Sequence, residues 1–159
     1  MLKTISNFDR DAMRITRIDH WLVRMPLAET ILWGSGKRSG TTRLICRIHT
    51  KDGGIGWGET ISLIDNVPAV FEKIVAPLAS GYCITDAERF HRHVFGAGYY
   101  HHKRAAVMAI AALEMAMWDA LGRRAGLPLS ALWGGLWRDR VAASAYIFVS
   151  DPQKGREKA

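Results

Sequence analysis

The stretch AIAALEMAMWDALG at 109–122 lies inside a longer apolar segment that runs from about Lys103 to Ala125. Alanines and larger apolar residues occur nearly all round its helical wheel, which predicts a buried helix in close contact with its neighbours. Gly126 follows as a typical C-terminal stop, and Pro128 cannot continue the helix. The stretch therefore predicts one long central helix around which the other elements are arranged.

The apolar sequence of this helix contains two carboxylates, Glu114 and Asp119. They are five residues apart, which is about 500° round a helix, so they do not point together as a catalytic pair would. We expect Asp119 to pair with Arg123 one turn further on, and Glu114 to cap or to pair with a neighbouring element.

The first sixty residues predict three β-strands, over 14–25, 41–50 and 55–60, because β-branched and aromatic residues alternate imperfectly with polar ones. The sequence KDGG at 51–54 predicts a hairpin turn, since its glycines accept positive φ. The strands are therefore expected to form one antiparallel meander. Residues 28–40, rich in glycine and serine, predict a long flexible loop, and such loops are disproportionately functional.

Helical patterns follow the strands. An apolar stripe predicts a helix over about 68–78, with Asn66 as a possible cap. Thr85 and Glu88 fit a capping box that would open a second helix, ending near Phe95. After the central helix, a short helical turn is expected over 130–133, and Val141 to Val149 resembles a new strand.

The composition bounds the class of protein. The chain has 159 residues, of which 48% are hydrophobic, so it is globular, but it is too short for a complete (β/α)₈ barrel of roughly 200 residues. The net charge of +7 is spread along the chain, so nucleic-acid binding is not expected. Cys46 and Cys83 are the only cysteines, which excludes a disulfide framework and indicates a reducing, cytoplasmic location. No apolar run reaches the roughly 20 residues of a membrane span.

Two patterns suggest chemistry but have simpler structural explanations. The glycines of GGIGWGE at 53–59 lie in a turn and a strand rather than before a helix, so they fail as a phosphate-binding loop. His91 and His93 do not share a helix face, and neither they nor the pair at 101–102 complete a metal-ligand set at recognised spacing. We interpret these histidines as surface or packing residues.

A combination of motifs resembles a known family. GWGET at 56–60 is followed by the helical passage at 109–122, then by AGLPL at 125–129 and LWGG at 132–135. Together they resemble the mandelate racemase/muconate lactonizing enzyme family of the enolase superfamily. The similarity extends over nearly the whole chain from Met13.

The resemblance implies an α+β fold, a three-stranded antiparallel meander followed by a helical bundle, as in an enolase-type N-terminal domain. It also implies the first strand of a truncated TIM barrel, at about Ala142 to Phe148. The expected organisation is a flexible leader over 1–12, a capping domain over 13–137, and an incomplete (β/α)₈ barrel over 138–159.

The family's reaction is abstraction of a proton next to a carboxylate, with the enediolate held by Mg²⁺. The bases and the three metal carboxylates of the family lie on later barrel strands, and this chain ends before those positions. The resemblance therefore implies a capping-domain fragment of an acid-sugar dehydratase, racemase or cycloisomerase, inactive alone, with no catalytic residue, no metal ligand and no Mg²⁺ of its own.

In such enzymes two loops of the capping domain close over the substrate. The resemblance places them at 28–40 and 61–67, and the substrate-facing candidates in them are Trp33, Ser35, Lys37, Ile61 and Leu63. The expected partner is a sugar acid or similar carboxylate in the full-length protein, together with a possible homo-oligomer and no membrane. The alternative is a free-standing α+β protein-interaction module or the remnant of a truncated gene, with an exposed strand at 141–149 that could pair with another chain.

Overall fold

The computed structural model describes residues 9–33, 36–62, 66–96 and 103–144, together with Gln153 and Arg156. Its strands are β1 (Ile15–Trp33), β2 (Gly36–Thr50) and β3 (Ile55–Ile61). Its helices are α1 (Val67–Val70), the π-helical segment η1 (Phe71–Val75), α2 (Ala76–Ala79), the 3₁₀ turn η2 (Ile84–Asp86), α3 (Ala87–Gly96), α4 (Lys103–Ala125) and α5 (Leu129–Leu132).

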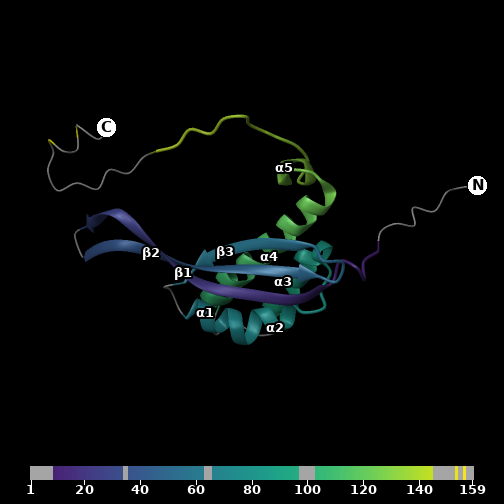
Figure 1. Ribbon diagram of the computed structural model, residues 1–159. Coiled ribbons are helices and arrows are strands. Elements are labelled where there is room, and N and C mark those ends of the chain that lie inside the picture. The colour runs from purple at the N-terminus through teal and green to yellow at the C-terminus, as the bar shows by residue number, and fades with distance from the viewer. Residues whose placement is uncertain are drawn as a thin grey trace, which may run out of the picture.

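The three strands form one antiparallel sheet in the order β1-β2-β3, which confirms the predicted meander (Figure 1). The hairpin between β2 and β3 closes at the predicted turn, where the Thr50 N–H donates to the Gly54 carbonyl at 2.9 Å. Gly53 has a φ of +86°, a conformation that glycine adopts without steric cost.

The prediction of a flexible loop at 28–40 is wrong, because most of this segment belongs to two paired strands. β1 continues to Trp33 and β2 begins at Gly36, with Ile31 paired to Arg38 across the ladder. The register shifts between Pro26 and Ile31, because proline has no N–H for the ladder and extra residues are accommodated there. Figure 1 shows the resulting hairpin arm of β1 and β2 extending beyond the helices, at the left of the view.

The helix predicted over 68–78 is present as α1, η1 and α2 in direct succession. The Ala76 N–H donates to the Phe71 carbonyl five residues back, and Pro77, which has no N–H, follows directly. Asn66 occupies the N-cap position, but its backbone is left-handed at φ 59° and its side chain makes no capping hydrogen bond, so its predicted capping role is wrong.

The predicted helix after Thr85 is confirmed as α3, but the capping box is not formed. The Thr85 hydroxyl lies 3.1 Å from the Cys83 sulfur, and the Glu88 carboxylate accepts a hydrogen bond from Arg92 at 2.7 Å. Both side chains of the expected box therefore have other partners, and η2 provides the entry to α3.

The central helix has its predicted bounds and lies directly against the sheet. A Cβ added to Gly58 would be 1.9 Å from the Ala112 carbonyl oxygen, and one added to Gly56 would be 2.0 Å from that of Ala116. The backbones of β3 and α4 are therefore in contact, which only glycine on the strand and small residues on the helix permit. The glycines of the GWGET motif and the alanines of α4 form this interface.

By length and composition alone, α4 is apolar enough to cross a membrane. Ten of its residues, among them Ile110, Leu113 and Met117, are buried within the domain. The core that they share with the sheet and the other helices also contains Leu44, Ile48, Phe71, Val75, Phe90 and Val94. The apolar character of α4 is thus accounted for by the core of the domain.

The chain leaves α4 as predicted. Gly126 has a φ of +65°, and the Leu127 N–H donates to the Gly122 carbonyl at 3.1 Å, the pattern of a glycine-terminated helix. The short turn predicted at 130–133 is α5. Of the strand expected at 141–149, residues 141–144 are exposed and belong to no strand, and residues 145–149 lie outside the described residues, as do the histidines at 101–102.

Candidate functional site

Two of the five predicted substrate-facing residues line one pocket. Lys37 in β2 and Ile61 at the end of β3 border a cavity of about 500 Å³, which we call the arm pocket. Trp33 is the last residue of β1, while Ser35 and Leu63 lie outside the described residues. The other residues that line the arm pocket are Arg24, Arg38, Ser39, Gly40 and Thr42.

The hairpin holds the two arginines of the arm pocket in place. Arg24 donates from Nη2 to the Ser39 hydroxyl at 3.1 Å, which joins β1 to β2. Arg38 donates from Nε to the Gly40 carbonyl at 3.1 Å and from Nη2 to the Thr41 hydroxyl at 2.6 Å. Because these partners are neutral oxygens, the guanidinium charges are oriented but not neutralised.

The arm pocket is therefore positively charged. Within the described part of the chain, Arg24, Lys37 and Arg38 form no ion pair with a carboxylate. Guanidinium and ammonium groups beside hydroxyls bind carboxylates and polyhydroxylated molecules through charge-assisted hydrogen bonds. Ser62 donates to the Thr42 carbonyl at 2.9 Å and so fixes the end of β3 against this pocket.

Sequence reasoning missed four side chains of this pocket, those of Arg24, Arg38, Ser39 and Thr42. Arg24 was expected only as part of a strand, and Arg38 and Ser39 only as part of a loop. The sequence does hold a signal for this arrangement, namely basic residues on both sides of the connection between the first two strands. A hairpin that pairs the residues before Pro26 with those near Gly40 brings Arg24 close to Arg38.

A second hollow, of about 540 Å³, lies between β3, α4 and α5, and we call it the α4–α5 groove. Trp118 and Trp133 meet there edge to face, with ring centroids 5.6 Å apart. The remaining lining residues are Trp57, Ala111, Glu114, Met115, Asp119, Arg123 and Leu129.

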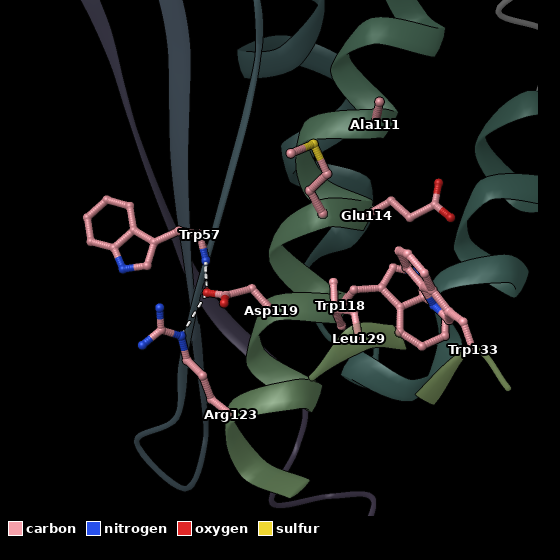
Figure 2. A pocket seen from close by; sticks show the side chains of 9 residues that line it. Trp57, Ala111, Glu114, Trp118, Asp119, Arg123, Leu129 and Trp133 are labelled. Carbon is pink, nitrogen blue, oxygen red and sulfur yellow. Dashed lines mark hydrogen bonds and ion pairs between the residues drawn. The ribbon is translucent and has the colours of Figure 1, made fainter. Parts of the chain in front are cut away.

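The carboxylates of the α4–α5 groove have structural partners, as predicted. Asp119 accepts hydrogen bonds from the Trp57 backbone N–H and from Arg123 Nε, each at 2.9 Å. Glu114 lies 3.4 Å from His91 Nδ1 on α3. Figure 2 shows Asp119 and Glu114 pointing to opposite sides of α4, so they do not form a joint acid–base site.

The described residues do not fit a metal centre. Across 9–33, 36–62, 66–96 and 103–144, no three His, Cys, Asp or Glu side chains are grouped closely enough to hold an ion. His91 stacks on Phe95, and His93 stacks on Tyr82 and lies 2.5 Å from its hydroxyl, so both histidines have packing roles.

Cys46 has no catalytic character. Burial raises the pKa of the Cys46 thiol to about 12, and its Sγ donates to the Ala112 carbonyl at 3.4 Å. A thiol with so high a pKa is not a nucleophile at neutral pH.

A cluster of charges surrounds Asp19 on the face of the sheet away from the helices. Its Oδ2 accepts a hydrogen bond from Arg47 Nη2 at 2.8 Å and another from Arg17 Nη2 at 3.2 Å. The same oxygen lies 2.8 Å from His49 Nε2. Hydrogen bonds from Arg47 and His49 lower the pKa of Asp19 from its ordinary 3.8 to about 2.

This shift predicts a specific loss of stability in acid. A carboxylate with a lowered pKa stabilises the fold above about pH 4, and that contribution disappears as the pH falls towards 2. Asp19→Asn should therefore destabilise the protein at pH 6 and flatten its stability between pH 4 and 2, as measured by urea denaturation. Asp139→Asn, which removes an exposed carboxylate after α5, is the control. A wild-type slope in Asp19→Asn would contradict the assignment.

Comparison with known proteins agrees with this fold. Residues 17–134 match the model of the mandelate racemase / muconate lactonizing enzyme N-terminal domain. The chain is 33% identical over 119 residues to a D-galactonate dehydratase family member of Streptomyces sp. SPB78, covering 73% of this chain and 26% of that protein. It is 30% identical over 151 residues to L-rhamnonate dehydratase of Saccharopolyspora erythraea, covering 87% of this chain and 37% of that protein.

Among solved structures, the muconate lactonizing enzyme of Mycobacterium smegmatis, complexed with muconolactone, superposes with a TM-score of 0.76 at 28% identity. The superposition covers 92% of this chain and 40% of that one. The chain thus spans between a quarter and two fifths of the length of these relatives. The meander, the glycine–alanine contact of β3 with α4 and the matched residues together show that the chain belongs to the mandelate racemase/muconate lactonizing enzyme family of the enolase superfamily, whose N-terminal domain it contains.

Proposed function

We propose that this chain is the capping domain of an enzyme that acts on a sugar acid or a similar carboxylate, and that its arm pocket selects the distal end of the substrate. The observation that carries this proposal is the arm pocket itself. The hairpin arm extends beyond the helices and collects Arg24, Lys37 and Arg38 beside Ser39, Thr42 and Ile61. The relatives named D-galactonate and L-rhamnonate dehydratase support a polyhydroxylated acid as the substrate class.

The proposed role is binding and enclosure. A lid that closes over a substrate excludes water from the reaction and completes the contacts that position the reacting carbon. Lys37 is the most adaptable donor here, because it is exposed and has no hydrogen-bond or ion-pair partner within the described ranges. Ile61 supplies an apolar surface for the carbon chain of the substrate.

The reaction of the full-length family type is abstraction of a proton next to a carboxylate, leading to dehydration, racemisation or cycloisomerisation. Mg²⁺ supplies charge stabilisation for the enediolate in such a reaction. The described residues of this chain do not fit Mg²⁺, since their carboxylates and histidines are dispersed and Asp119 is already paired. We therefore assign substrate binding to this chain and no chemical step, and we propose that it is catalytically silent alone.

The test is a titration of the full 159-residue chain with D-galactonate and L-rhamnonate, followed by amide NMR. Amide shifts should change around Lys37, Ser39 and Thr42. Lys37→Ala should weaken this binding by roughly tenfold, because a hydrogen bond to a charged group contributes about 1.5 kcal/mol. Lys73→Ala removes another exposed ammonium group, from η1 and away from the arm, and should leave the binding unchanged.

The same samples, incubated with Mg²⁺ in deuterium oxide, report on catalysis. We expect no exchange of the α-proton above a control without protein. Exchange that survives repurification would contradict catalytic silence, and equal binding by Lys37→Ala and wild type would contradict the arm pocket as the substrate-selecting site.

A further inference from the structure

The charged side chains of the arm pocket can only donate hydrogen bonds. Arg24, Lys37 and Arg38 are the charged residues that line it, and guanidinium and ammonium groups carry no acceptor. Among the described residues that line the pocket there is no Asp, Glu, Asn, Gln or His. Its acceptors are therefore limited to hydroxyl and backbone carbonyl oxygens.

Several of these acceptor oxygens are already occupied. Hydrogen bonds reach Ser39 Oγ from Arg24 at 3.1 Å, the Gly40 carbonyl from Arg38 at 3.1 Å and the Thr42 carbonyl from Ser62 at 2.9 Å. The donors, by contrast, are mostly unused. In hydrogen bonds to described residues, Arg24 uses one N–H group, Arg38 uses two and Lys37 uses none. The donors that remain in the pocket therefore exceed the acceptors that remain.

This imbalance favours one kind of ligand group over another. A sugar hydroxyl both donates and accepts, so a chain end made of hydroxyls needs acceptors that this pocket lacks. A carboxylate or a phosphate only accepts, and its oxygens match the planar fork of a guanidinium group. The arm pocket therefore complements an anionic group better than a polyhydroxylated chain end.

The charge of the pocket leads to the same conclusion. In the open arm Arg24, Lys37 and Arg38 are exposed, so water offsets the repulsion between them. A lid that closes over a substrate removes that water, and charges that lose water without an opposite charge nearby are strongly destabilising. An anionic group on the enclosed end of the substrate supplies the opposite charge.

The reacting carboxylate of the substrate cannot be this group. In the proposed reaction it lies next to the carbon that loses its proton, whereas the arm pocket receives the distal end. We propose that the substrate carries a second anionic group, a carboxylate or a phosphate, at its distal end, and that Arg24, Lys37 and Arg38 bind it. The proposal rests on the proposed function, and it separates the substrate from D-galactonate and L-rhamnonate, whose distal ends are uncharged.

The experiment compares sugars that differ only at their sixth carbon, namely D-galactose, D-galacturonate and D-galactose 6-phosphate. Each is titrated into the full chain at physiological salt, and its Kd is taken from the amide shifts of residues 37–42. At least one of the two anionic sugars should bind roughly tenfold more tightly than D-galactose, since charge-assisted hydrogen bonds are the stronger ones. The tighter of the two identifies the group as a carboxylate or a phosphate. Equal affinities for all the sugars would overturn the proposal.

Variants separate the arm pocket from the general attraction of a basic chain for anions. Arg38→Gln should weaken the binding of the anionic sugars roughly tenfold and leave that of D-galactose unchanged. Lys37→Met should do the same, and it breaks no hydrogen bond among the described residues. Arg43→Gln is the control, because it removes the same charge from β2 at a residue that does not line the pocket.

Circular dichroism melting establishes that each variant is folded. An equal loss of affinity in Arg43→Gln would overturn the proposal, and so would a preference for anionic sugars that survives in both Arg38→Gln and Lys37→Met.

Failure of this proposal can be told apart from failure of the proposed function. If neither D-galactonate nor any of the other sugars shifts the amides of the arm, the arm pocket is not a substrate site and the proposed function fails. If these amides shift but D-galactose binds as tightly as the anionic sugars, the substrate site stands and the second anionic group is wrong. D-galactonate reports only on the proposed function, because its own carboxylate is free to enter the pocket of this chain.

Discussion

Gly58→Ala is expected to lower the free energy of unfolding by about 3 kcal/mol, at the upper end of the usual cost of overpacking. The added methyl group would lie 1.9 Å from the Ala112 carbonyl oxygen and 3.0 Å from the Ala116 nitrogen. Both atoms belong to the backbone of α4 in the middle of the helix, so neither can move aside as a side chain could. A domain of this size has a total stability of roughly 5–15 kcal/mol, so this single methyl group removes a large part of it.

The measurement is urea denaturation of the full chain, with Gly96→Ala as the matched control. Gly96 ends α3, and an added Cβ would meet no atom within 4 Å. The same chemical change should therefore alter the stability by no more than about 0.5 kcal/mol there. Equal denaturation midpoints for the two variants would show that β3 and α4 do not approach each other as closely as the structure has them.

The residues that make the close approach at Gly58 are also a pattern that can be recognised in the sequence, which is one reason why the fold could be predicted. A strand that carries glycine at alternate positions, at Gly56 and Gly58, leaves a flat inner surface, and a helix with alanines spaced by four residues fits it. The period-two pattern of the strands and the helix stop at Gly126 are local signals, and the tertiary contacts of the folded domain agree with them. The meander and the bounds of α4 therefore follow from residues close together in the chain.

The hairpin arm could not be predicted in the same way. Its residues Thr30, Ile31 and Leu32 favour a strand, but the glycines that follow favour a loop, and local preference cannot decide between them. Pairing across the arm makes this segment a strand. Ile31 pairs with Arg38 and Leu32 pairs with Lys37, and both pairs require the register shift between Pro26 and Ile31. Such a register depends on the whole hairpin.

The candidate site was predicted only in part for the same reason. The resemblance to the family pointed to the segments 28–40 and 61–67 as the ones that cover the substrate. Lys37 from the first and Ile61 from the second line one pocket. Arg24 joins them through pairing across the sheet, which spacing along the sequence does not reveal.

Ala112→Leu is expected to lower the free energy of unfolding by about 2 kcal/mol, because a larger side chain must be forced into a fully packed interface. Ala112 is completely buried on the side of α4 that faces β3, where its carbonyl also accepts the hydrogen bond from Cys46. The neighbouring Ala111 is the control. It is rotated by about 100° round the helix and lines the open α4–α5 groove, so a leucine there has room.

Ala111→Leu should therefore change the stability by no more than about 0.5 kcal/mol in the same urea experiment. The two variants have the same composition and almost the same position on α4, so helix propensity and the unfolded state cancel between them. Their difference isolates the side of α4 that meets the sheet. A greater loss of stability in Ala111→Leu than in Ala112→Leu would mean that α4 is rotated relative to β3, and the explanation of Gly56 and Gly58 as close-contact residues would fail with it.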